Sequence, residues 1–125
     1  MKLLKSSFYL SNIFLIIFYL YPASLLGCFF YNDCQFQPQL TRDLSYVSSN
    51  HFYSFIFISL IGLFSFKKKI KVIMFYLVFL SIVLELTHLI IPYRAFELQD
   101  LFGNFLGVVL SYILFKIINK IIIIN

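Results

Sequence analysis

Charged residues are scarce in this sequence. They make up 12% of its 125 residues, whereas soluble globular proteins carry roughly 25%. Hydrophobic residues make up 62%. This composition excludes a disordered chain, which needs low hydrophobicity and high charge. It also excludes a water-soluble domain, because one domain of this size would leave too little polar surface to cover its apolar side chains. The sequence therefore predicts a protein whose solvent is lipid.

The motifs of soluble enzymes and nucleic-acid-binding proteins are also missing. The sequence contains no P-loop, no dinucleotide-binding glycine pattern and no zinc-finger spacing. The formal net charge of +5 comes without the dense basic patch that a nucleic-acid-binding protein needs. We therefore expect no nucleic-acid partner and no cofactor, and we attribute the positive charge to the membrane.

Four mainly apolar runs with few charges are long enough to cross a bilayer, since about 20 mainly apolar residues in a helix span the hydrocarbon core. Each run is expected to be helical, because lipid leaves backbone groups unsatisfied in isolated strands and four strands cannot close a barrel. The sequence thus predicts an all-α membrane protein, a four-transmembrane-helix bundle in which residues 1–125 form a single domain. The expected spans are residues 8–26, 47–66, 72–91 and 101–122.

The lysines occur only at the two ends of the chain and in one of the connections between the expected spans. Loops rich in lysine and arginine remain on the cytoplasmic side of a membrane. Both termini are therefore expected to be cytoplasmic, and the acidic residues and the two arginines are expected on the opposite side. The lysines are Lys2, Lys5, Lys67, Lys68, Lys69, Lys71, Lys116 and Lys120.

Cys28 and Cys34 lie in or beside the first outward loop. An oxidising outer compartment would let them pair, so a small disulfide loop is expected, and two free thiols are the alternative. The first expected span permits a second interpretation, because Leu25-Leu26-Gly27-Cys28 resembles the lipobox of a lipoprotein signal. Its apolar stretch is longer than the usual signal core, which argues against a signal and for a retained span.

Few ionisable groups lie inside the expected spans, and each is a functional candidate because a charge in lipid is costly unless it is paired or hydrated. Glu85 and His88 lie three residues apart, on one face of the third expected helix, and are the candidate catalytic acid and base. Arg94 follows on a short connection, where its planar guanidinium would suit a phosphate or a carboxylate. The expected ligand-binding residues are His51, Arg94, Asp100 and Asn104.

The same residues also suit a structural role. Asn, His and Glu side chains between helices form interhelical hydrogen bonds, and Asp100 would cap a helix. Gly103, Gly107 and Ser111 place a small residue at every fourth position of the last expected helix. This spacing predicts a face for close helix packing.

A spaced pattern of residues marks the second half of the chain. It consists of Glu85, His88, Pro92, Arg94, Phe96, Asp100, Gly103, Asn104 and Gly107, and Asn50-His51-Phe52 precedes it. In its order and spacing this pattern resembles the VanZ-like family of small bacterial membrane proteins, over about residues 51–111. The chain departs from the family in having His88 where glutamine is common. The resemblance implies a multi-pass protein of the bacterial cytoplasmic membrane, and it implies a link to low-level resistance to the glycopeptide teicoplanin.

Two functions from different classes fit these observations. In the first, an outward-facing polar pocket binds, or binds and modifies, the head group of a membrane lipid, a lipid-linked envelope precursor or another surface component. A glycopeptide is a further expected partner. In the second, the chain is a non-enzymatic helper that forms an oligomer or docks on a larger envelope complex. The chain lacks a placed nucleophile, which favours the helper over covalent catalysis.

Two further possibilities have less support. Glu85-x-x-His88 has the spacing of di-iron bundles, but such sites need a second pair of this kind and two further carboxylates. Only His51 and Asp100 could assist here, so we expect no metal. A transporter of four short spans would have to oligomerise to enclose a pathway.

Overall fold

The computed structural model describes residues 2–124, in which every regular element is helical. Five α-helices and one short 3₁₀ turn follow one another along the chain. They are α1 (Lys2–Leu20), α2 (Leu25–Tyr31), α3 (Ser49–Ser65), η1 (Lys67–Lys69), α4 (Ile70–Thr87) and α5 (Leu98–Ile124). The expectation of an all-α protein is confirmed for these residues.

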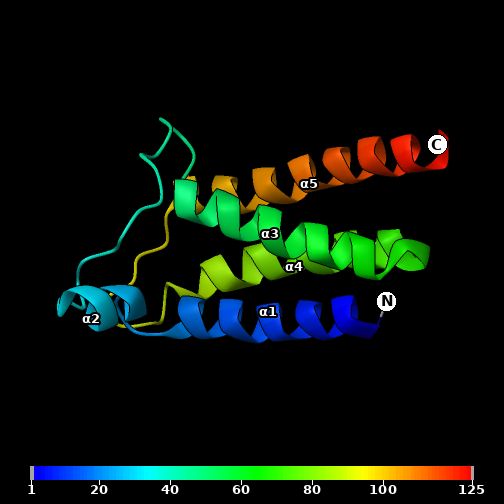
Figure 1. The fold of residues 1–125 in the computed structure, drawn as a ribbon. Coiled ribbons are helices and arrows are strands. Elements are labelled where there is room, and N and C mark those ends of the chain that lie inside the picture. The colour runs from blue at the N-terminus through cyan, green and yellow to red at the C-terminus, as the bar shows by residue number, and fades with distance from the viewer. Residues whose placement is uncertain (1, 125) are drawn as a thin grey trace.

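The four long helices form a bundle, and α2 lies at one end of it (Figure 1). In Figure 1 the N and C termini lie at the opposite end from α2, together with the turn between α3 and α4. Helix α3 packs most extensively against α5 and also contacts α1 and α4. All eight lysines therefore lie toward the end of the bundle with the termini, and α2 and the loop after it lie at the other, which we call the outer end.

The bundle exposes large apolar side chains on its surface and buries several polar side chains within a mainly apolar core. Ser59, Ser81 and Asn104 are fully buried, whereas Phe75 is 74% exposed and Phe57 is 62% exposed. Three helical segments are long and apolar enough to cross a membrane, and they are Lys2–Leu20, Lys67–Thr87 and Leu98–Ile122. Large apolar residues on the outer surface suit lipid as the surrounding solvent.

The first apolar helix ends earlier than the expected span 8–26. Helix α1 ends at Leu20, and Pro22 follows it. A proline disfavours the helical conformation of the residue before it, so the chain breaks here. Residues 25–31 then form the separate helix α2, which Ser24 caps by accepting a hydrogen bond from the backbone N–H of Gly27 at 3.0 Å.

The third expected span, 72–91, also ends early in the structure. Helix α4 ends at Thr87, after which three successive i→i+3 hydrogen bonds tighten the chain, the first from His88 N to Glu85 O at 3.1 Å. Pro92 prevents further helix at this point. Glu85 therefore lies in the last turn of α4, nearer the outer end of the bundle than expected. The other two expected spans agree with α3 and α5 to within a turn.

Small residues let α5 approach α3 closely. A Cβ atom added to Gly103 or to Gly107 would lie 2.7 Å from a backbone carbonyl oxygen of α3 or of its N-cap. One turn further on, Ser111 is fully buried, and its Oγ lies 3.1 Å from the backbone oxygen of Ile56 in α3. Gly103, Gly107 and Ser111 thus all lie against α3, on the face that their spacing predicts.

A disulfide between Cys28 and Cys34 closes the segment around α2, with the two Cα atoms 4.1 Å apart. The backbone N–H of Ser24 donates to the carbonyl of Cys34 at 2.8 Å and holds the same turn together. The irregular loop that follows is attached to the start of α3, because the amide of Asn50 donates to Pro38 O at 2.7 Å and accepts from Leu40 N at 3.0 Å. This loop therefore forms a wall beside the outer ends of the helices.

Candidate functional site

Carboxylates and imidazoles from three helix ends meet at the outer end of the bundle. His51 lies in the first turn of α3, Glu85 in the last turn of α4 and Asp100 in the first turn of α5. The Nε2 atom of His51 lies 3.2 Å from Asp100 Oδ2, and its Nδ1 atom lies 4.0 Å from Glu85 Oε2. Glu85 is fully buried, and its Oε1 accepts hydrogen bonds from His88 Nδ1 at 3.3 Å and from the backbone N–H of Glu97 at 3.0 Å.

A tyrosine of α1 connects this cluster to Asn104. The hydroxyl of Tyr19 donates to Asn104 Oδ1 at 2.6 Å and lies 2.7 Å from His51 Nδ1. The Tyr19 ring also stacks on the ring of His88, with the two centroids 5.5 Å apart. Hydrogen bonds therefore join α1, α3 and α5 at one depth.

Arg94 does not point its whole guanidinium into the cluster. Its Nη2 donates to the carbonyl of Phe18 at 3.0 Å, and its Nε lies 3.4 Å from the carbonyl of Tyr21. These carbonyls belong to the end of α1, where helical oxygens lack partners and attract a cation. Burial lowers the pKa of the Arg94 guanidinium, but an arginine remains charged in a protein. Two of its five N–H groups are engaged in this way, and the other three have no partner among residues 2–124, so they can bind an anion.

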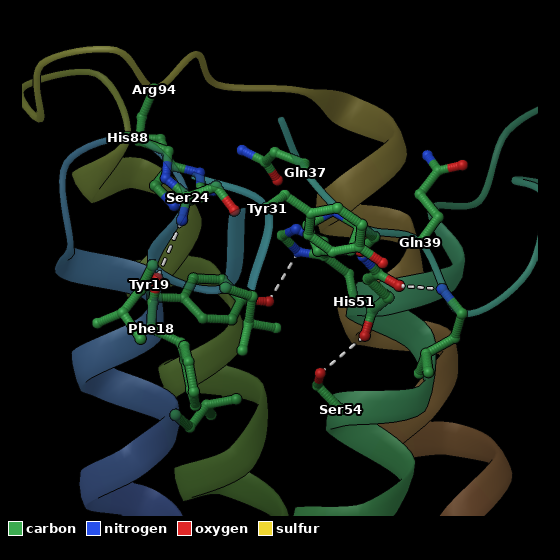
Figure 2. Close-up of a pocket in the computed structure, with 16 residues that line it drawn as sticks. Phe18, Tyr19, Ser24, Tyr31, Gln37, Gln39, His51, Ser54, His88 and Arg94 are labelled. Atoms are coloured by element: carbon green, nitrogen blue, oxygen red, sulfur yellow. Dashed lines mark hydrogen bonds between the residues drawn. The ribbon is translucent and has the colours of Figure 1, made fainter. Parts of the chain in front are cut away.

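A cavity of about 480 Å³ opens beside these residues. His51, His88 and Arg94 line it together with apolar side chains of α1 and α2. Figure 2 shows Tyr19 and His51 facing one another in it, with Arg94 and His88 close together. A second hollow of about 290 Å³ shares His51, His88 and Arg94, and Asp100 lines it as well. Glu85 and Asn104 do not line either cavity and lie beneath the residues that do.

The structure thus brings His51, Glu85, His88, Asp100 and Asn104 together and places Arg94 at the edge of the group. Two atoms of this group are buried and have no hydrogen-bond partner within the described residues, namely Nε2 of His88 and Oε2 of Glu85. Since His88 lines both cavities, this nitrogen is available to a bound molecule. An acid, two imidazoles and a guanidinium beside a cavity can bind an anionic group and exchange a proton with it.

The model of the VanZ/LLP1 family matches residues 6–119, which is most of the chain. The chain belongs to the VanZ/LLP1 family. The resemblance inferred from the sequence is therefore confirmed, and it extends beyond residues 51–111 to include α1. No curated protein and no solved structure shows a significant match to the chain. With its three long apolar helices, this VanZ-like chain is a membrane protein.

Sequence reasoning missed Tyr19, which lies at the centre of the site. The chain contains nine tyrosines, and nothing in the local sequence distinguishes this one. It also missed Gln37 and Gln39, which line both cavities from the outward loop. Asn50 also lines both cavities. The sequence did carry a signal for this residue, because Asn50 directly precedes His51 in the pattern that resembles the family.

We predict that Tyr19→Phe lowers the free energy of unfolding, because it removes the hydroxyl between His51 and Asn104. An interhelical hydrogen bond of this kind contributes about 0.6 to 2 kcal/mol. The matched control is Tyr9→Phe, since Tyr9 lies exposed on the same helix. Denaturation in detergent, followed by circular dichroism, measures both variants. An equal effect of the two substitutions would contradict the role of Tyr19.

Proposed function

We propose that this VanZ-like protein acts at the bacterial cell envelope, where its polar cavity binds the head group of a lipid-linked or surface component. The observation that carries the proposal is the mixed lining of the 480 Å³ cavity. Its lining combines apolar residues of α1 and α2 with His51, His88 and Arg94. A molecule with an acyl or prenyl chain and an anionic head group matches both kinds of residue.

The charges at this end favour a phosphate as the head group. Arg94 offers planar N–H donors that match phosphate oxygens. Nε2 of His88, whose Nδ1 donates to Glu85, can accept a hydrogen bond from a hydroxyl of the head group. Glu85 lies behind His88 and holds its Nδ1 at 3.3 Å, which orients the imidazole toward the cavity. In this proposal His88 exchanges a proton with a bound head group, and Glu85 supports it from behind.

The proposal includes four membrane crossings with both termini in the cytoplasm. Helix α3 is shorter than the other three, with 17 residues, but it runs beside α5 for most of its length (Figure 1). The lysines at the end of the bundle with the termini suit the cytoplasmic side under the positive-inside rule. The cavity and the disulfide then lie on the outer side of the cytoplasmic membrane, where an oxidising environment preserves a disulfide.

The test measures the binding of farnesyl diphosphate and of farnesol to the full chain in lipid nanodiscs. We expect the diphosphate to bind at least about tenfold more tightly, because each hydrogen bond to a charged group contributes about 1.5 to 3 kcal/mol. Arg94→Gln should abolish this preference. Arg42→Gln is the matched control, since Arg42 lies exposed on the outward loop, and it should leave the preference intact. Equal binding of the two prenyl compounds would overturn the proposal.

A cellular measurement extends the same test to glycopeptides. In a strain whose teicoplanin sensitivity responds to this protein, Glu85→Gln, His88→Ala and Arg94→Ala should each restore sensitivity at equal protein level. If all three variants protect the strain as well as the natural chain does, these residues have no part in resistance.

A second candidate function is a non-enzymatic helper that docks on a larger envelope complex. The observation that favours it is the internal use of the site residues. Tyr19, His51 and Asn104 bond to one another, and Arg94 bonds to the end of α1. If the chain is a helper, truncation of each of these side chains should destabilise the bundle. Truncation of residues kept for binding often leaves stability unchanged or raises it.

A further inference from the structure

The hydrogen bonds around His51 determine which of its ring nitrogens carries a proton. The single hydrogen of the Tyr19 hydroxyl is donated to Asn104 Oδ1 at 2.6 Å. Asn104 keeps this oxygen toward Tyr19 because its Nδ2 faces the carbonyl of Ser81 at 3.4 Å. His51 Nδ1 lies 2.7 Å from the Tyr19 oxygen and 3.2 Å from Asn104 Oδ1, which now both act as acceptors. The hydrogen of a neutral His51 is therefore on Nδ1, and its lone pair is on Nε2.

This lone pair faces a carboxylate. Asp100 Oδ2 lies 3.2 Å from His51 Nε2. Two electron pairs at this distance repel one another unless a positive charge lies between them. Either a proton held between the imidazole and the carboxyl group or a metal ion relieves this repulsion.

Glu85 distinguishes these two possibilities. Its Oε2 is fully buried and accepts no hydrogen bond within the described residues, while its Oε1 accepts two. Leaving a buried acceptor of this kind without a partner is costly, and more so for a charged group. One ligand atom from each of His51, Glu85 and Asp100 lies within 4.8 Å of the other two. A proton between His51 and Asp100 leaves Glu85 Oε2 unsatisfied, whereas a cation among the three residues satisfies it.

We propose that His51 Nε2, Glu85 Oε2 and Asp100 Oδ2 bind one divalent transition-metal ion of the zinc type. Ligands about 2.0 to 2.2 Å from a tetrahedral zinc ion lie about 3.4 Å apart, and the His51 to Asp100 separation is 3.2 Å. The contact between Glu85 Oε2 and His51 is longer, at 4.0 Å, and involves Nδ1, so the Glu85 carboxylate has to move toward Nε2 when the ion binds. An imidazole with two carboxylates suits zinc, manganese or iron better than magnesium or calcium, which prefer oxygen ligands alone. This site differs from the Glu85-x-x-His88 pair that the sequence suggested, because His88 Nδ1 bonds to Glu85 instead.

Neighbouring groups hold two of the ligands in the orientation that metal sites use. The proton on the second nitrogen of His51 is bonded to Tyr19, and the second oxygen of Glu85 is bonded to His88 and to the backbone of Glu97. Such partners fix the orientation of a ligand and raise its affinity for the metal. His51 and Asp100 line the 290 Å³ hollow, so the fourth coordination position faces a space that water or a head group can enter.

The test is direct metal binding by the full chain, purified in detergent with an affinity tag that contains no histidine. After treatment with a chelator, the protein is equilibrated with Zn²⁺ or Co²⁺ and the bound metal is measured by mass spectrometry. We expect about one ion per chain, and with Co²⁺ the visible absorption bands of tetrahedral coordination. Asp100→Asn should weaken binding about a hundredfold or more, and Tyr19→Phe about tenfold.

Asp33→Asn is the matched control, because it makes the same chemical change on the outward loop, outside the cluster. It should bind the ion like the natural chain. We use an Asp100 variant rather than a Glu85 variant, because Glu85 is fully buried and its replacement endangers folding. The Asp100 side chain is 17% exposed at the edge of the hollow. Absence of a bound ion in the natural chain would overturn the proposal, and so would equal binding by Asp33→Asn and Asp100→Asn.

The ion site is a separate claim from head-group binding, and the two fail separately. If the natural chain binds the ion but does not prefer farnesyl diphosphate to farnesol, the head-group proposal alone is rejected. If the natural chain binds no added metal ion but still prefers farnesyl diphosphate to farnesol, the ion site alone is rejected.

Discussion

Replacement of Gly107 by leucine is expected to separate α5 from α3 and to destabilise the protein by about 3 kcal/mol or more. A Cβ atom at this position would lie 2.7 Å from Phe52 O and 2.9 Å from Phe55 Cβ. The Phe52 oxygen belongs to the backbone of α3 and cannot rotate away, so the two helices must move apart. That movement would also separate Ser111 from the carbonyl of Ile56.

Alanine substitutions provide the matched control for this prediction. At Gly62, a Cβ atom would meet the ring of Phe8 at 2.7 Å, and a side chain can adjust. In a helix, alanine is favoured over glycine by about 1 kcal/mol. Gly62→Ala should therefore be much less destabilising than Gly107→Ala. Because the chain contains no tryptophan, unfolding by sodium dodecyl sulfate is best followed by circular dichroism. Equal stability of the two alanine variants would show that the contact between α3 and α5 is looser than described.

Replacement of Glu85 by leucine is expected to have a comparably large effect, because it removes the acceptor for one buried and one part-buried donor. The backbone N–H of Glu97 and Nδ1 of His88 both donate to Glu85 Oε1. A buried group left without its partner costs about 1 to 3 kcal/mol. We expect the loss of stability to be accompanied by faster hydrogen exchange at the amide of Glu97 and in the rest of the connection from α4 to α5.

Two further variants separate the loss of an acceptor from the loss of a charge. Glu85→Gln retains an oxygen that can accept, so it should protect the Glu97 amide better than Glu85→Leu does. Glu97→Gln makes the same change in an exposed side chain and should leave both stability and exchange unchanged. Slow exchange of the Glu97 amide in Glu85→Leu would show that Glu85 does not hold this connection.

The sequence by itself determined that the chain is helical and belongs in lipid. Apolar runs bounded by lysines and prolines leave few other structures, because a bilayer tolerates only internally bonded backbone. The spacing of Gly103, Gly107 and Ser111 correctly predicted a packing face on the last helix. The polar residues that the structure groups together were also recognisable, because each is conspicuous in so apolar a chain. The ends of two helices were predicted wrongly, because the apolar runs continue past Leu20 and Thr87 although the helices end there.

Only the tertiary structure decided what the polar residues do to one another. The crossing of α1, α3 and α5 brings Tyr19, His51 and Asn104 within hydrogen-bonding distance, and no local pattern specifies how distant helices cross. The same crossing turns part of Arg94 toward the end of α1 and places Glu85 Oε2 beside His51. Sequence spacing reports which residues share a helix face, whereas the distances between atoms of different helices depend on how those faces pack.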